Sequence, residues 1–115
     1  MIIGTTPTHT FNLPFSTDII TSARFIYQQN GQEVLRKTTT DLRLGEMSIS
    51  ADLTQEDTFL FDCRHSVKLQ VRVRTIEGKV LSTKPRLLPV EECLDTECLY
   101  DEITPGEINV DEGKV

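Results

Sequence analysis

The stretch that decides the fold is VKLQVRVRT, residues 67–75. Apolar and polar residues alternate through it without a break: Val67, Leu69, Val71 and Val73 against Lys68, Gln70, Arg72 and Arg74. Successive side chains of a strand point to opposite faces, so this spacing predicts a β-strand with one buried and one solvated face.

A second strong signal lies upstream, in ARFIYQQNGQEVLRKTTT, residues 23–40. Asn30-Gly31 is the dipeptide that a type I′ turn prefers, because both central residues need a positive φ. The flanking residues are strand formers, so we predict a hairpin whose first strand buries Ala23, Phe25 and Tyr27. A two-residue turn would set Phe25 opposite Arg36, so that a core residue and an arginine would share one face of the sheet. Either a bulge or a twisted edge would resolve this conflict.

The other strands are shorter. Residues 8–13 lie between Pro7 and Pro14 and predict a first strand, and residues 15–22 predict a connector with one helical turn. MSISADL, residues 47–53, places Met47, Ile49, Ala51 and Leu53 on a core face. Residues 80–90 contain two prolines, as an edge strand tolerates. Short strands with turn signals near every tenth residue predict an all-β antiparallel β-sandwich, with a small barrel as the alternative.

The stretch LTQEDTFLFDC, residues 53–63, resembles the approach to strand F of immunoglobulin variable domains. Thr54 and Asp57 have capping-box spacing for a short helical turn, and Phe59 and Phe61 are expected to enter the core. No cysteine precedes Cys63 and the chain has no tryptophan, so the family's disulfide and binding function do not transfer. The resemblance implies an immunoglobulin-like crossover between two sheets.

Charge divides the chain into two parts. The net charge of −6 opposes nucleic-acid binding, which requires a basic face. Residues 1–90 carry eleven lysines and arginines against nine acids, a balance of +2, and form the predicted sandwich domain. Residues 91–115 carry nine acids and one lysine, a balance of −8, and are expected to be flexible or ordered only by a partner.

We find no signal peptide or membrane-spanning segment and expect a cytoplasmic protein.

Cysteine and histidine suggest little chemistry. Cys63, His65, Cys93 and Cys98 could supply four zinc ligands, but their spacing lacks the tight pairs of zinc sites, so free thiols are expected. Cys63 and His65 lack an oxyanion hole and an orienting acid for nucleophilic catalysis. His9 is expected to be an exposed strand residue. We therefore predict no enzymatic activity, no metal and no cofactor.

The candidate interaction residues fall into two groups. One is the basic row on the polar face of residues 67–75, and the other is a short run in the acidic tail: Lys68, Arg72 and Arg74, with Cys98, Leu99, Tyr100, Asp101 and Glu102. A solvated strand face accounts for the basic row by itself. The alternative is that the row receives an acidic segment, such as this tail from a neighbouring subunit.

The opening MIIGTTPTHTFNLPF, the hairpin, LTQEDTFLFD, VKLQVRVRT, the EGK turn and CLDTECL together resemble short phage or prophage proteins of Gram-positive gut bacteria. The resemblance spans about 100 residues and rests on a strand pattern. It implies an immunoglobulin-like virion module of the tail or baseplate region, without catalytic residues. Its expected partners are protein subunits, with a possible homo-oligomer, and its expected location is the host cytoplasm and then the virion.

A different class of function is a ligand-binding module that recognises carbohydrate. Such sites present exposed aromatic rings, but the chain has only Tyr27 and Tyr100 besides its phenylalanines, and Tyr27 is expected in the core. Protein–protein assembly is therefore the first hypothesis and carbohydrate recognition is the alternative.

Overall fold

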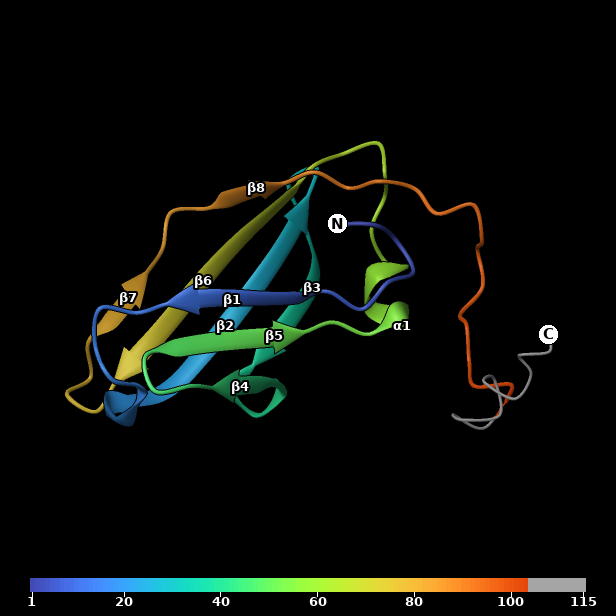
Figure 1. The fold of residues 1–115 in the computed structure, drawn as a ribbon. Helices are drawn as coiled ribbons and strands as arrows, with labels where there is room; N and C mark the ends of the chain where they lie inside the picture. The colour runs from blue at the N-terminus through green and yellow to red at the C-terminus, as the bar shows by residue number, and fades with distance from the viewer. Residues whose placement is uncertain (104–115) are drawn as a thin grey trace.

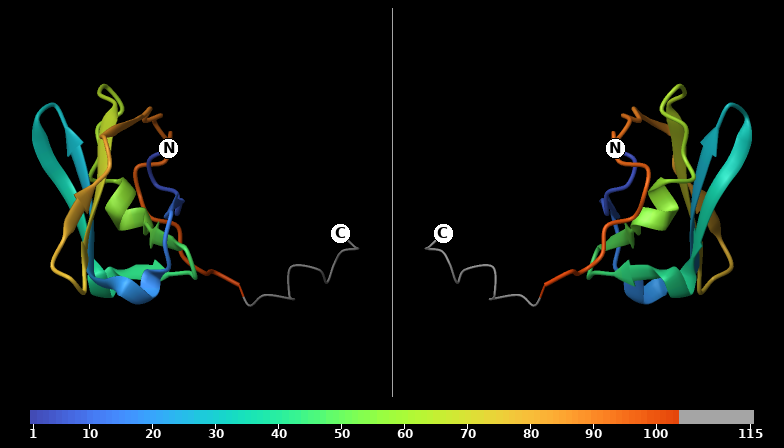
Figure 2. Two further views of the ribbon diagram at one scale, coloured as in Figure 1. Left: turned by 90° about the vertical axis from the view of Figure 1, so that its left-hand side faces the viewer. Right: turned by 90° about the vertical axis from the view of Figure 1, so that its right-hand side faces the viewer.

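The computed structural model describes residues 1–103. Within that range eight strands form two antiparallel sheets that face each other (Figures 1 and 2). The three-stranded sheet has the order β1-β5-β4, and its strands span Thr8–Asn12, Ser48–Asp52 and Leu42–Leu44. The five-stranded sheet has the order β3-β2-β6-β7, and β8 also pairs with β6. Its strands span Gln32–Thr38, Ile20–Gln29, Val67–Thr75, Val80–Ser82 and Arg86–Leu88.

The order of these strands is immunoglobulin-like. β1, β5 and β4 take the places of strands B, E and D, while β3, β2, β6 and β8 take those of C′, C, F and G. Within residues 1–103 the one α-helix is the short α1, Gln55–Thr58, which joins β5 of one sheet to β6 of the other. The predicted antiparallel β-sandwich with an immunoglobulin-like crossover is confirmed.

The core of residues 1–103 lies between the two sheets and contains no disulfide. Phe11 of β1 meets Phe25 of β2 edge-on at 5.5 Å between ring centroids, and Tyr27 packs 5.8 Å from Phe61. The inward side chains of β6 complete this layer, as their alternation predicts: Val67, Leu69, Val71 and Val73. The contact between Phe11 and Phe25 thus joins the two sheets, in a chain that lacks the tryptophan of antibody domains.

The hairpin of β2 and β3 contains the predicted turn and a bulge. Asn30 and Gly31 both have positive φ, at 50° and 78°. The register shifts between Tyr27 and Gln28, so that Phe25 lies opposite Lys37 and not opposite Arg36. Of the two alternatives, the structure therefore contains the bulge, which changes the residue that lies opposite Phe25.

Several local predictions are also confirmed. A 3-10 turn, η1, spans Thr17–Ile19 in the predicted connector, and a second, η2, spans Thr39–Asp41. Thr54 and Asp57 form the capping box of α1. The two edge segments β7 and β8 both pair with β6 and are separated by a break that contains Pro85.

Three predictions of burial are wrong. Met47 is 48% exposed, because β5 begins only at Ser48 and Met47 belongs to the preceding turn. Phe59 is half-buried outside the central core, because it caps α1 and packs over Gly4. His9 is half-buried and not exposed, because it lies on the inward side of β1 with Phe11.

The chain beyond β8 pairs with the first residues. The Ile3 amide donates to the Glu91 carbonyl at 3.0 Å, and the Glu91 amide donates to the Met1 carbonyl at 2.8 Å. Figure 2 shows this orange segment running beside the N-terminal blue segment. The division of the chain after residue 90 stays a prediction, and residues 104–115 of the predicted tail lie outside the described residues. Among residues 1–103, no helix has the length and apolar character to cross a membrane.

Candidate interaction surface

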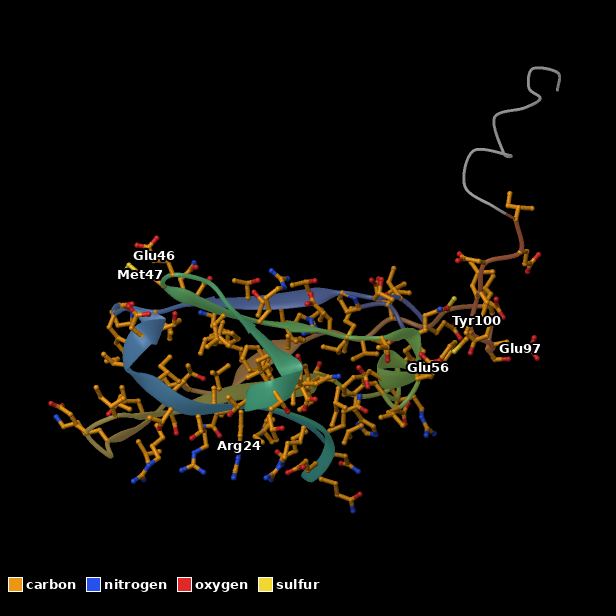
Figure 3. The ribbon with its side chains drawn as sticks, turned by 90° about the horizontal axis from the view of Figure 1, so that it is seen from below. Arg24, Glu46, Met47, Glu56, Glu97 and Tyr100 are labelled. Carbon is orange, nitrogen blue, oxygen red and sulfur yellow. The ribbon has the colours of Figure 1, made fainter. Side chains whose placement is uncertain are left out.

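The predicted basic row lies on the outer face of the five-stranded sheet. Arg72 and Arg74 are exposed even positions of β6, directly opposite Arg24 and Ser22 of the neighbouring β2. Sequence reasoning missed Arg24, which points away from the sandwich in Figure 3. Alternation alone places Arg24 on an outer face, but only the β2–β6 register brings it beside Arg72. We call Arg24, Arg72 and Arg74 the arginine cluster.

No residue of the arginine cluster forms an ion pair with any residue in 1–103. The ion pairs of this part of the chain are formed by other cations: Arg36, Lys37, Arg43 and Arg64. Within residues 1–103, the one hydrogen bond formed by a side chain of the cluster runs from Arg72 Nε to the Ser82 hydroxyl, at 3.3 Å. Like charges directly across a sheet repel, so the cluster concentrates positive charge on this face. The nearest compensation is Glu33, which is already paired with Arg36 and whose pKa is lowered chiefly by that pairing and also by the charge of Arg24.

A shallow hollow of about 190 Å³ opens within the cluster. The three arginines line it together with Ser22, Val80 and the strand positions Ala23 and Val73. Val80 lies opposite Arg74 on β7 and provides an apolar rim. The hollow is smaller than the roughly 300 Å³ at which drug-sized ligand pockets begin. It suits a compact charged group rather than a nucleotide or a sugar chain.

Lys68 belongs to the same outer face but stands apart from the hollow. Four residues along a strand separate Lys68 from Arg72, a distance of roughly 13 Å. Between them, the Gln70 amide donates to the Thr83 carbonyl at 2.8 Å and interrupts the row. The structure thus places Arg72 and Arg74 beside Arg24 of β2, and it places Lys68 further along the same outer face.

The predicted tail residues lie elsewhere, against α1. The Gln55 amide and the backbone of Leu99 form two reciprocal hydrogen bonds: Nε2 donates to the Leu99 carbonyl at 2.7 Å, and the Leu99 amide donates to Oε1 at 2.6 Å. The Tyr100 hydroxyl donates to Glu56 Oε2 at 3.3 Å. Figure 3 shows Glu56, Glu97 and Tyr100 grouped at one end of the molecule, away from Arg24.

This attachment buries little of the tail. Leu99 and Tyr100 are 70% and 67% exposed, and Leu94 is 95% exposed. Cys98 is half-buried, whereas Asp101 and Glu102 are exposed. No hydrogen bond or ion pair within the described range joins residues 91–103 to the arginine cluster. We call residues 91–103 the acidic segment; it presents carboxylates and apolar side chains together.

The cysteines and histidines do not converge. Cys63 is exposed in the turn before β6, and Cys93 and Cys98 are half-buried free thiols. Among residues 1–103, no group of three or more histidines, cysteines and acids is placed to hold a metal ion. His9 instead hydrogen bonds to the Tyr27 hydroxyl at 2.7 Å between the sheets. Burial, and secondarily the N-terminal ammonium, lowers the pKa of His9.

Comparisons with known proteins add little beyond the fold. No protein-family model and no curated protein matches the chain. Among solved structures, the chain is similar to the V domain of amphioxus IgVJ-C2, with 12% sequence identity and a TM-score of 0.29. The match covers 77% of this chain and 95% of the amphioxus chain.

Proposed function

We propose that the protein is a non-enzymatic assembly module that binds a second copy of itself, the acidic segment of one copy docking on the arginine cluster of the next. The observation that carries this proposal is the cluster itself: three arginines on one outer sheet face without a carboxylate partner among residues 1–103. A module of the tail or baseplate region of a phage is the setting that the sequence resemblance suggests.

Charge complementarity supports the choice of partner. The arginine cluster belongs to the part of the chain with a balance of +2, and the acidic segment begins the part with a balance of −8. Within one copy, Tyr100 is held at α1 and contributes nothing to the outer face of β6. A contact between copies pairs the two surfaces, and since different patches meet, it is head-to-tail and can extend into rings or filaments.

The apolar residues of the acidic segment fit the same arrangement. Leu94, Leu99 and Tyr100 are exposed between carboxylates. The outer sheet face offers Val80 and Leu87, which are 48% and 68% exposed. Burial of such side chains contributes affinity, while the charges contribute orientation and a faster association rate.

Light scattering on the full chain tests this proposal at low and high salt. We expect a mass above that of a monomer at low salt and a decrease at high salt, because exposed charge pairs are screened. Arg72→Glu and the double variant Asp101→Asn/Glu102→Gln should each give a monomer. The matched controls are Lys84→Glu, on the β7–β8 connection, and Glu46→Gln/Glu77→Gln, in two exposed turns. A wild-type monomer under every condition would refute self-assembly.

A further inference from the structure

Resting on this proposed function, we infer that the hollow between Arg24, Arg72 and Arg74 is an oxyanion site that takes one carboxylate of the acidic segment of a second copy.

The donors around the hollow have the chemistry that an oxyanion needs. A guanidinium presents N–H groups in a planar fork that matches the two oxygens of a carboxylate. Arg24 and Arg72 face each other across β2 and β6, and Arg74 lies two residues along β6 from Arg72. The Ser22 hydroxyl, opposite Arg74, adds a neutral donor to the same wall.

These donors are free to act. Within residues 1–103, the side chains of Arg24 and Arg74 form no hydrogen bond, and Arg72 uses only Nε, toward Ser82. Its two terminal nitrogens therefore remain available. Arg36 of β3, on the same sheet, is by contrast already bonded to Glu33 through hydrogen bonds of 3.0 and 2.8 Å. The three like charges repel one another across and along the strands, and a bound anion relieves this repulsion.

The size and walls of the hollow select the ligand. About 190 Å³ accommodates a carboxylate or phosphate with some of its water, but not a large ring system. Val80 forms an apolar wall beside Arg74. A carboxylate that neighbours an apolar residue matches this combination, and the acidic segment contains such sequences, as in Leu94-Asp95 and Tyr100-Asp101.

Nuclear magnetic resonance of the arginine Nε–Hε groups in the full chain tests the site directly. The probes are sodium glutarate, a free dicarboxylate, and inorganic phosphate, each against sodium chloride at equal ionic strength. We expect saturable shifts for Arg24, Arg72 and Arg74 with glutarate. Arg72→Gln should weaken glutarate binding about tenfold, the effect of losing one charge-assisted hydrogen bond. Lys84→Gln should leave the binding unchanged.

The outcomes separate this inference from the proposed assembly. If glutarate binds and dissociates the oligomer seen by light scattering, both stand. Glutarate that saturates the three arginines without affecting the oligomer supports the site and rejects its role in assembly. In a third outcome, Arg72→Glu abolishes assembly, but glutarate shifts the arginine Nε–Hε signals no more than sodium chloride does. The face is then a docking surface, and the oxyanion site is refuted. Saturable binding of phosphate alone, without glutarate, also refutes a carboxylate site.

Discussion

The Tyr27 hydroxyl and His9 Nδ1 form a hydrogen bond of 2.7 Å that joins β2 of one sheet to β1 of the other. Tyr27 is fully buried and His9 is half-buried, so water does not readily replace either partner. Burial, and after it the charge of Asp57, raises the pKa of Tyr27, so the phenol stays protonated. The two sheets are thus connected by a polar contact beside the apolar side chains of the core.

We predict that Tyr27→Phe lowers the free energy of unfolding by about 1 kcal/mol, because it leaves His9 Nδ1 without its partner while preserving the ring. Urea denaturation followed by circular dichroism measures the change. Tyr100→Phe is the control, since its hydroxyl bonds to Glu56 in an exposed contact. Equal effects of the two substitutions would show that the hydrogen bond between the sheets adds no more to the free energy of unfolding than an exposed one.

Stability should fall as the pH decreases below neutrality, and His9 should be a cause. The pKa of His9 in the folded state is lowered from its usual 6.5, chiefly by burial. The unfolded state therefore binds a proton more readily, so the stabilisation is complete above pH 6.5 and decreases as the pH falls toward the folded pKa. Melting temperatures between pH 8 and pH 5 test this. His9→Gln should flatten the profile in that window, whereas His65→Gln, which retains His9, should keep the slope.

The sequence predicts the sandwich well because its main signals are local. Alternation along residues 67–75 assigns the inner face of β6, and Asn30-Gly31 assigns a turn. Met47 and Phe59 were misassigned because a turn and a helix cap interrupt the alternation at those positions. Periodicity reports the face of a residue only while the strand continues.

The candidate surface is harder to predict because it depends on pairing between distant segments. The row of charges on β6 is visible in the sequence, but the neighbour of Arg72 is set by the register with β2, 48 residues earlier in the chain at Arg24. Likewise, Gln55 meets Leu99 through a side-chain amide that mimics a backbone pair, and no periodicity indicates such a contact. The composition of the sequence reveals a near-neutral part, residues 1–90, and an acidic part, residues 91–115. Only the fold shows where their charged side chains lie.

The ion pair between Lys37 and Asp57 should contribute more to stability than the other salt bridges. Their atoms lie 2.7 Å apart with 15% and 17% of the side chains exposed. Partial burial opposes ionisation of Asp57, but hydrogen bonds from Lys37 and Thr54 outweigh it and lower the pKa of Asp57. We predict that Lys37→Gln costs about 2 kcal/mol of unfolding free energy, between the effects of surface and fully buried pairs.

The control for Lys37→Gln is Arg64→Gln. Arg64 pairs with Asp62 at 2.8 Å, but its side chain is 81% exposed. Its loss should cost less than about 0.5 kcal/mol, because solvent and salt screen an exposed pair. A double-mutant cycle of Lys37→Gln with Asp57→Asn isolates the coupling between the two side chains, and a coupling near zero would contradict the prediction.

Gly4 should be the least replaceable glycine of those with positive φ. Gly4 and Gly31 have φ values of 84° and 78°, so alanine at either position is strained by about 1 kcal/mol. A Cβ at Gly4 would lie 2.9 Å from Phe59 Cζ, whereas a Cβ at Gly31 would meet no atom within 4 Å. Gly4→Ala must therefore also displace a ring that packs the N-terminal segment against α1. We expect Gly4→Ala to cost about 1 kcal/mol more than Gly31→Ala, the lower end of overpacking penalties. Thermal denaturation of the two variants measures the difference. If Gly31→Ala were equally destabilising, the strained backbone conformation alone would account for both effects. The contact with Phe59 would then add nothing to the loss of stability.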